Sequence, residues 1–165
     1  MTKTVPIAIT ILRLNGKFLL LKRRNPPYEN LWGLVGGKVN VGEHIPSAAI
    51  REVMEETGSS LPNSYALKGI VSERLVSIDG ELKSHFLIFV GDAKIDSFCE
   101  DHREGQLALF ELEEILGMQA KVVPSDFQMF TRFHEKSTEH VEYHEAELIQ
   151  DGKDYRLSYY REGYV

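Results

Sequence analysis

The sequence predicts an α+β fold, in which helices are layered against a mixed β-sheet. Ile7, Ile9 and Ile11 alternate along the first apolar segment, which is typical of a strand with one buried face. Residues 46–57 have the apolar spacing of an amphipathic helix. Three dipeptides that favour hairpin turns lie between apolar segments, and they are Asn15-Gly16, Asp79-Gly80 and Asp151-Gly152.

The first half of the chain alternates strands with one helix. Pro26 and Pro27 exclude a regular element from the loop at 23–28. Pro46 suits the first turn of the helix, and Gly58 is a good terminator because glycine readily adopts a positive φ. The pattern predicts strands at 4–14, 17–22 and 65–78, a short apolar segment at 32–35, and a short strand at 38–41.

The second half continues with strands and two helices. Ser125 is the expected N-cap of the last helix, which places Phe127, Phe130 and Phe133 on one side. The pattern predicts strands at 81–90 and 106–112, a polar loop at 91–105, helices at 113–118 and 126–134, and a closing hairpin formed by 141–150 and 153–160.

Composition excludes several classes of protein. The 165 residues fit one domain with an ordinary core, with 42% apolar and 27% charged residues. The formal net charge of −6 argues against broad binding to nucleic acid or to anionic membranes. Cys99 is the single cysteine, so an intrachain disulfide is excluded and we expect a buried or half-buried, inert thiol. The sequence shows no signal peptide and no membrane span, so we expect a cytoplasmic protein.

Three glutamates in the predicted helix indicate a functional site. Glu52, Glu55 and Glu56 fall on one narrow face, because residues three and four apart in a helix are neighbours. Such like charges destabilise a bare helix by a few tenths of a kcal/mol per pair. A hard divalent cation that binds carboxylate oxygens would offset this repulsion, and so would Arg51, four residues before Glu55.

The stretch from Gly37 to Ser59 resembles the box of the Nudix family, G-x5-E-x7-R-E-U-x-E-E-x-G-U, in which U is aliphatic. The matching residues are Gly37, Glu43, Arg51, Glu52, Val53, Glu55, Glu56 and Gly58. Ser59 departs from the last aliphatic position, and Val35 stands where the family often has proline. The resemblance implies an α/β/α sandwich over residues 4–134. The hairpin at 137–165 is then an appendage to a single Nudix domain that spans residues 1–165.

The resemblance also implies an activity, namely hydrolysis of a nucleoside diphosphate linked to another moiety, with Mg²⁺ or Mn²⁺ as cofactor. Metal ligands would be the Gly37 carbonyl, Glu52, Glu55 and Glu56, and Arg51 would orient the glutamates through Glu55 or Glu43. Glu43 and Gly58 would have structural roles in the motif. A metal-activated water would attack phosphorus, because the cation neutralises the anionic substrate and lowers the pKa of bound water.

The sequence offers more than one candidate for the general base and for the substrate contacts. Glu52 is the first choice for the base and Glu104 the second, because the run after Glu104 resembles the acidic loop of the family; Glu100 and Asp101 compete with it. Candidate phosphate contacts are Arg23 and Arg24, because arginine binds phosphate in a bidentate manner. Residues that could stack on a base are Tyr28, Trp32 and Phe86. His140 and His144 are expected to have no metal-binding role.

Several functional alternatives stay open. The run from Arg23 to Gly33 is similar to the ADP-ribose pyrophosphatase-like branch of this MutT-like family, yet no proline lies between Pro62 and Pro124. ADP-ribose, a sugar nucleotide and a nucleoside triphosphate are therefore all candidate substrates, with no nucleic-acid or membrane partner. The alternatives are a non-catalytic nucleotide-binding regulatory module and an isomerase that would need Cys99. The tyrosines of the last hairpin predict either a homodimer interface or packing on the main sheet, and they are Tyr143, Tyr155, Tyr159, Tyr160 and Tyr164.

Overall fold

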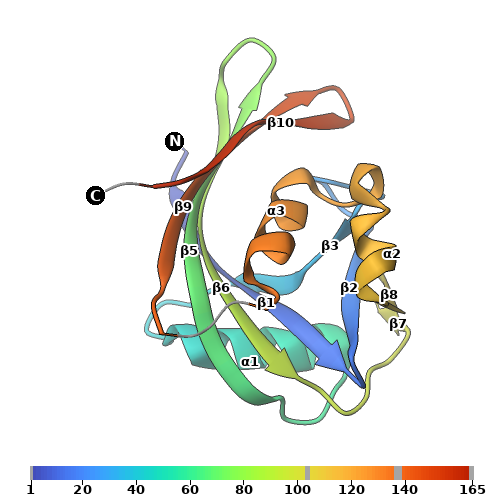
Figure 1. Cartoon of the computed structure of the whole chain (residues 1–165). Helices are drawn as coiled ribbons and strands as arrows, with labels where there is room; N and C mark the ends of the chain where they lie inside the picture. The colour runs from blue at the N-terminus through green and yellow to red at the C-terminus, as the bar shows by residue number, and fades with distance from the viewer. Residues whose placement is uncertain (1, 103–104, 136–138, 164–165) are drawn as a thin grey trace.

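The protein is described from a computed structural model that covers residues 2–102, 105–135 and 139–163. Within these residues, ten strands form one curled sheet (Figure 1). The strands are β1 (Thr4–Leu14), β2 (Lys17–Arg23), β3 (Trp32–Gly33), β4 (Val35–Lys38), β5 (Asn63–Ser77), β6 (Leu82–Lys94), β7 (Asp101–His102), β8 (Gly105–Phe110), β9 (Glu142–Asp151) and β10 (Asp154–Glu162). The helices are α1 (Ile45–Thr57), α2 (Leu112–Leu116) and α3 (Pro124–Phe133), with a 3₁₀ turn at Gln119–Lys121.

The sheet is mixed, as the sequence predicted. Its main path runs β10-β9-β5-β6-β1-β2-β8-β7, while β3 pairs with β2 and β4 pairs with β1. The β1–β6 and β5–β9 pairs are parallel, and the other pairs are antiparallel. All three predicted hairpins are present, joining β1 to β2, β5 to β6 and β9 to β10.

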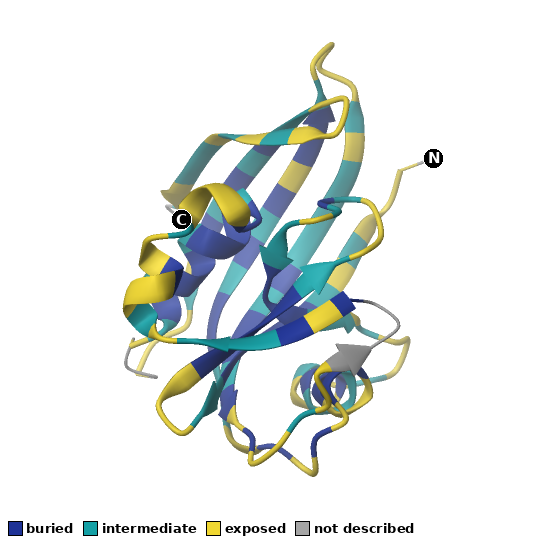
Figure 2. Cartoon of the chain, turned by 90° about the vertical axis from the view of Figure 1, so that its right-hand side faces the viewer, coloured by how far each residue is buried: buried dark blue, intermediate teal, exposed yellow. Residues whose placement is uncertain are grey.

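Helices cover the two faces of the sheet, so the predicted α/β/α sandwich is confirmed. On one face, Ala48 and Ala49 of α1 pack on Ala8 of β1. On the other face, Phe130 and Phe133 of α3 pack within the largest buried cluster. Figure 2 shows buried residues along the strands and on the inner sides of the helices, with exposed residues at the outer helical surfaces and hairpin tips. The alternation of Ile7, Ile9 and Ile11 therefore marks the α3 side of the sheet.

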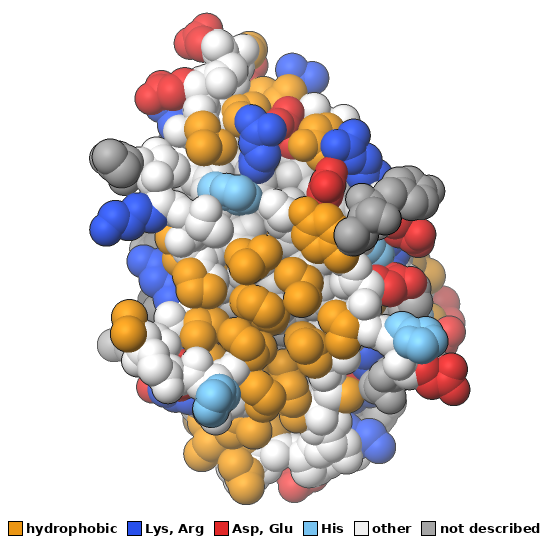
Figure 3. Space-filling view, turned by 90° about the vertical axis from the view of Figure 1, so that its left-hand side faces the viewer, with side chains coloured by type: hydrophobic (Ala, Val, Ile, Leu, Met, Phe, Trp, Pro, Cys, Tyr) orange, Lys and Arg blue, Asp and Glu red, His pale blue; other side chains and the backbone are white. Residues whose placement is uncertain are grey.

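The C-terminal hairpin extends the main sheet, because β9 pairs in parallel with β5. Tyr155 and Tyr160 pack against buried clusters, whereas Tyr143 keeps 38% of its surface exposed. Tyr164 lies outside the described residues. Hydrophobic side chains also gather in the middle of the face that Figure 1 shows at its left, with charged side chains around them (Figure 3). The homodimer stays a prediction.

Four local predictions were wrong. Residues 39–41 are not a strand, because β4 ends at Lys38 and the chain then turns. Residues 91–94 are not loop, because β6 continues there in parallel pairing with β1, and a short β7 follows. Val123 is the N-cap of α3 and Ser125 is buried inside its first turn, because Pro124 already begins the helix. Cys99 is exposed.

The described part of the chain contains no helix that is long and apolar enough to cross a membrane.

Candidate active site

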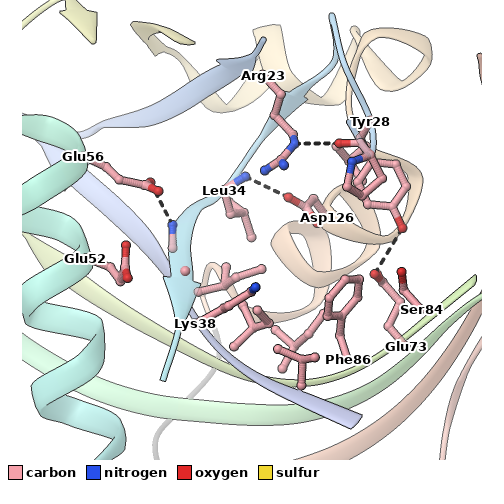
Figure 4. Close-up of a pocket in the computed structure, with 18 of the residues that line it drawn as sticks. Arg23, Tyr28, Leu34, Lys38, Glu52, Glu56, Glu73, Ser84, Phe86 and Asp126 are labelled. Atoms are coloured by element: carbon pink, nitrogen blue, oxygen red, sulfur yellow. Dashed lines mark hydrogen bonds between the residues drawn. The ribbon is translucent and has the colours of Figure 1, made fainter. Parts of the chain in front are cut away.

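The ends of α1 fix where its glutamates point. The helix follows His44 with a proline in its first turn, and Gly58 ends it with φ = 67° and an N–H that donates to the Met54 carbonyl over 3.0 Å. Its buried residues are Ala48, Ala49, Val53, Glu56 and Thr57, and the small alanines bring the helix close to β1. Glu52 and Glu56 consequently face strand β4 (Figure 4).

Two glycines in β4 let the backbone approach these carboxylates. A Cβ on Gly37 would lie 2.4 Å from Cδ of Glu52, so no larger residue fits against the carboxylate as it stands. A Cβ on Gly36 would lie 2.2 Å from the Ala8 carbonyl oxygen. The Gly36 N–H donates to Oε2 of Glu56 over 3.2 Å. The Gly-Gly pair of the motif is thus explained by close approach on both sides of the strand.

Arg51 connects the loop before α1 to the acidic face. Its Nε and Nη2 donate to the two oxygens of Glu43 over 2.8 and 2.9 Å, which is a bidentate pair. Its Nη1 donates to Glu52 over 2.7 Å and to Glu55 over 3.2 Å, and its Nη2 donates to the Lys38 carbonyl over 3.0 Å. The hydrogen bonds from Arg51 lower the pKa of Glu43 to about 2. Arg51 therefore contacts both residues named for it from the sequence, and Glu52 as well.

A cleft with a volume of about 660 Å³ adjoins this group. Figure 4 shows Glu52 and Glu56 at one end, and Tyr28, Glu73, Ser84 and Phe86 at the other. Of the predicted residues, those that line the cleft are Arg23, Tyr28, Gly37, Glu52, Glu56 and Phe86. Those that do not line it are Arg24, Trp32, Glu43, Arg51, Glu55 and Gly58. Trp32 instead packs edge-on against Phe110, with ring centroids 5.0 Å apart.

The remaining predicted acids lie elsewhere. Glu104 lies outside the described residues, and so does the side chain of Asp101. Glu100 is exposed and is not among the residues that line the cleft. Cys99 lies beside Gly58 at the far end of α1, so the cleft lacks the cysteine that the isomerase alternative requires.

The oxygen atoms at the end of the cleft near α1 suit a hard divalent cation. Glu52, Glu56 and the backbone of Gly36 and Gly37 share one wall of the cleft, and all of these groups offer oxygen ligands, which Mg²⁺ and Mn²⁺ prefer. The Glu52 carboxylate fills the space that a Cβ on Gly37 would take, so the backbone of Gly37 and this carboxylate lie side by side. Glu55, which pairs with Arg51, is the most exposed of the three glutamates Glu52, Glu55 and Glu56.

Two buried acids at the cleft were not predicted from the sequence. Glu73 and Asp126 are only 3% and 9% exposed. The Leu34 N–H donates to Oδ2 of Asp126 over 2.9 Å, and the Tyr28 hydroxyl donates to Oε2 of Glu73 over 3.2 Å. Burial raises the pKa of Glu73 to about 7, with the Asp126 charge as the next cause, and burial also raises the pKa of Asp126 to about 6. The sequence contains no clear signal for either residue, because Glu73 lies between Ser72 and Arg74 on β5 and Asp126 lies in the first turn of α3.

These shifts predict an effect of Glu73→Gln on stability that depends on pH. Because the folded state raises the pKa of Glu73 from 4.5 to about 7, ionised Glu73 destabilises the fold, and this cost grows between pH 4.5 and pH 7. Glutamine carries no charge, so the variant should unfold with a free energy about 3 kcal/mol higher than the parent at pH 8 and nearly equal at pH 4.5. Urea denaturation across this pH range measures the difference.

Glu145→Gln is the matched control for this prediction, because Glu145 is on β9 and pairs with Arg161 at the surface. The difference in unfolding free energy for the control should stay below about 1 kcal/mol at every pH. If the difference in unfolding free energy between Glu73→Gln and the parent does not change with pH, ionisation of Glu73 is not its cause.

A second group of potential ligands lies on the C-terminal hairpin. In the described part of the chain, Glu142, His144 and Glu162 bring three ligand atoms within 4.8 Å of one another. His144 is fully buried, its Nδ1 lies 2.7 Å from the Tyr160 hydroxyl and its Nε2 lies 3.0 Å from Oε2 of Glu142. Its ring also stacks on Phe133. Both ring nitrogens thus have partners, and packing explains the residue.

Known protein families match the part of the chain that contains this cleft. The family model described as the NUDIX domain matches residues 2–133. The uncharacterized Nudix hydrolase YvcI of Bacillus subtilis is 30% identical over 118 residues, which cover 70% of this chain and 71% of that protein.

Two further similarities concern a shorter segment and a solved structure. An ADP-ribose pyrophosphatase of Methanocaldococcus jannaschii is 36% identical over 80 residues, which cover 48% of this chain and 44% of that protein, so this chain spans less than half of that relative. The crystal structure of a mutator MutT protein from Bacillus halodurans superposes with a TM-score of 0.78 at 25% identity, covering 96% of this chain and 97% of the other.

Proposed function

The chain belongs to the Nudix family, and on that premise we propose that it is a divalent-cation-dependent hydrolase. Its reaction would cleave a phosphoanhydride bond in a nucleoside diphosphate linked to another moiety. The candidate substrates are ADP-ribose, a sugar nucleotide and a nucleoside triphosphate. The cation would be Mg²⁺ or Mn²⁺, because the ligands named below are all oxygen atoms.

One observation carries this proposal. The carboxylates of Glu52 and Glu56 and the backbone of Gly37 line the same end of a cleft that is large enough for a small-molecule ligand. Arg51 contacts Glu52 from outside the cleft, so the carboxylate keeps its place against Gly37. Gly37 leaves room for the Glu52 carboxylate beside the strand, where a Cβ would occupy its place.

The residues have distinct proposed roles. Glu52, Glu55, Glu56 and the Gly37 carbonyl would hold the cation, which supplies charge neutralisation and a more acidic bound water. Glu52 would accept the proton of the attacking water, and Glu104 is the second candidate for this role. Arg51 positions Glu52 and Glu55, while Glu43 fixes Arg51 in turn. Arg23 lines the cleft and would contact the substrate phosphates; Arg24 is a second candidate.

The test is a substrate panel with the full chain. Release of phosphate and nucleoside monophosphate would be measured for nucleoside triphosphates, including 8-oxo-dGTP, and for ADP-ribose, sugar nucleotides, NADH and dinucleoside polyphosphates. We expect turnover of at least one substrate class with Mg²⁺ or Mn²⁺, and its loss when EDTA removes the cation. Nucleotide binding without turnover of any substrate would favour the regulatory module instead.

Three other expectations stay predictions: the single-domain organisation of residues 1–165, the cytoplasmic location and the homodimer.

A further inference from the structure

The loop at 24–31 forms one wall of the cleft. It joins β2 to β3, and Pro26, Pro27 and Tyr28 line the cleft together with Arg23, which directly precedes the loop. Nε of Arg23 donates to the Pro27 carbonyl over 2.9 Å (Figure 4). The shape of the loop therefore decides where the Arg23 guanidinium and the Tyr28 ring lie relative to a substrate.

The conformation of this loop is costly and depends on contacts outside it. Tyr28 adopts φ = 68°, a region that bulky residues rarely occupy. Within the loop, the Asn30 N–H donates to the Arg23 carbonyl over 2.8 Å, and the Leu31 N–H donates to the Tyr28 carbonyl over 3.2 Å. These bonds close the loop on itself. A costly backbone conformation persists only where the surrounding structure holds it, so the side chains that pack on the loop matter.

The C-terminal hairpin packs on this loop. Tyr28 and Leu31 belong to an apolar cluster that also contains Leu148 of β9, and Tyr155 and Leu157 of β10. The rings of Tyr28 and Tyr155 meet edge to face, with centroids 4.7 Å apart and an angle of 65° between their planes. Aromatic pairs in this geometry are favourable beyond the area that they bury. The hairpin therefore touches the loop at the residue with the costly conformation.

A bend in the hairpin directs Tyr155 towards the loop. The pairing of β10 with β9 shifts by one residue between Leu157 and Tyr159, and such a bulge bends a strand. Figure 1 shows the tip of this hairpin over the side of the sheet that carries α3. Tyr155 and Leu157 face the loop, whereas Tyr159 is on the opposite side of the sheet, where the Arg161 guanidinium lies 4.5 Å from its ring centre.

A hollow beside this contact gives the loop room to move. Its volume is about 390 Å³, and among the residues that line it are Glu29, Asn30 and Leu31 of the loop and Lys153, Asp154 and Tyr155 of the hairpin. The Tyr155 hydroxyl lies 3.5 Å from Oε2 of Glu29, which is too long for a strong hydrogen bond. The Tyr155 ring thus bridges the hairpin and the loop, and its removal would enlarge the hollow.

We propose that Tyr155 is a positioning residue, which acts through Tyr28 to hold the loop at 24–31 against the cleft. This inference rests on the proposed function, because the contacts that it positions are those of the proposed hydrolase with its substrate. Tyr155 is not among the described residues that line the cleft. Without its ring, Tyr28 and the Pro27 carbonyl can shift, and Arg23 then loses the hydrogen bond that orients its guanidinium. The proposed cation ligands on α1 and β4 are outside this chain of contacts.

The first measurement separates KM from kcat for Tyr155→Ala. It uses the best substrate of the panel at saturating Mg²⁺, well below the thermal midpoint of each variant. We expect KM to rise about tenfold while kcat changes by less than about threefold, because substrate contacts are lost and the cation ligands are kept. Tyr155→Phe should keep both constants within about twofold of the parent, because the ring remains. Tyr155→Leu keeps apolar volume, so it should raise KM about threefold, and it carries the test if the alanine variant does not fold.

Tyr159→Ala is the matched control, because it removes the same side chain from the same strand on the opposite side of the sheet. Its KM and kcat should stay within about twofold of the parent values, since the change lies away from the loop.

The second measurement needs no turnover. Hydrogen exchange of the ligand-free protein, followed by mass spectrometry, reports on the amides of residues 24–31, of which Asn30 and Leu31 are hydrogen-bonded within the loop. In Tyr155→Ala these amides should exchange at least about tenfold faster, while those of β1 keep the rate of the parent, because the loop opens locally. Tyr159→Ala should change neither rate.

The two measurements distinguish the failure of either proposal. An unchanged KM in folded Tyr155→Ala, an equal rise in KM for Tyr159→Ala, or equally faster exchange in the loop and in β1 would overturn the positioning role and leave the hydrolase standing. No turnover on the panel would contradict the hydrolase. In that case, faster exchange confined to the loop would still support the hold of Tyr155 on the loop, and unchanged exchange would overturn it.

Discussion

Replacing Glu56 by glutamine is expected to lower turnover by about 10²–10³-fold without unfolding the protein. The Glu56 carboxylate is 6% exposed, lies at the α1 end of the cleft and accepts the Gly36 N–H. Glutamine keeps the volume and one carbonyl oxygen, so the contact with β4 can persist. The charge is lost, and with it much of the affinity for a divalent cation.

The measurement is the turnover number for the best substrate of the panel at saturating Mg²⁺, together with the thermal midpoint. Glu145→Gln serves again as the control with the same chemical change at a surface position, and its turnover should equal that of the parent. Unchanged turnover for Glu56→Gln would remove Glu56 from the proposed ligands. Recovery at much higher Mg²⁺ would locate the defect in cation affinity.

The largest expected loss of stability comes from Phe133→Ala. The Phe133 side chain is fully buried, and its ring lies over Gly69 of β5, where a Cβ would be 2.4 Å from Cζ. The ring also stacks on His144 of β9, with centroids 4.8 Å apart. Its removal leaves a cavity between α3 and two strands, so the free energy of unfolding should fall by about 3–5 kcal/mol. That is a large share of the roughly 5–15 kcal/mol typical of a folded domain.

Urea denaturation at pH 7 tests this expectation, and the thermal midpoint should fall by about 6–20 °C. Leu116→Ala is the control, because Leu116 is 46% exposed on α2 and its truncation should change stability by less than about 1 kcal/mol. If Phe133→Ala lowers the free energy of unfolding no more than Leu116→Ala does, Phe133 does not hold α3 on the sheet.

The sequence predicted best those features that are local along the chain. The hairpin turns, the alternating strand β1 and the helix with three glutamates each depend on neighbours within a few residues, and the structure contains all of them. The contact of Arg51 with Glu43 was also predictable, because the two residues are eight apart and belong to one motif. Local errors arose where a turn residue or a proline decided a boundary, as at Pro124 and Ser125.

Features that depend on distant residues could not be predicted in this way. Glu73 and Asp126 lie 53 residues apart in the sequence, and only the packing of α3 on the curled sheet brings them to one cleft. Each looked like an ordinary acid, on a strand or at a helix start. The parallel pairing of β9 with β5 joins segments about 70 residues apart, so no short-range pattern indicated that the last hairpin would extend the sheet.

That pairing has a consequence for the order in which the molecule assembles. Strand β5 has β6 on one side and β9 on the other, and β9 is made late in synthesis. Until residues 142–151 leave the ribosome, the outer edge of β5 presents unpaired N–H and carbonyl groups beside apolar residues such as Val71 and Leu75. Pairing with β9 satisfies this edge of β5, and β10 then becomes the outer strand on this side of the sheet.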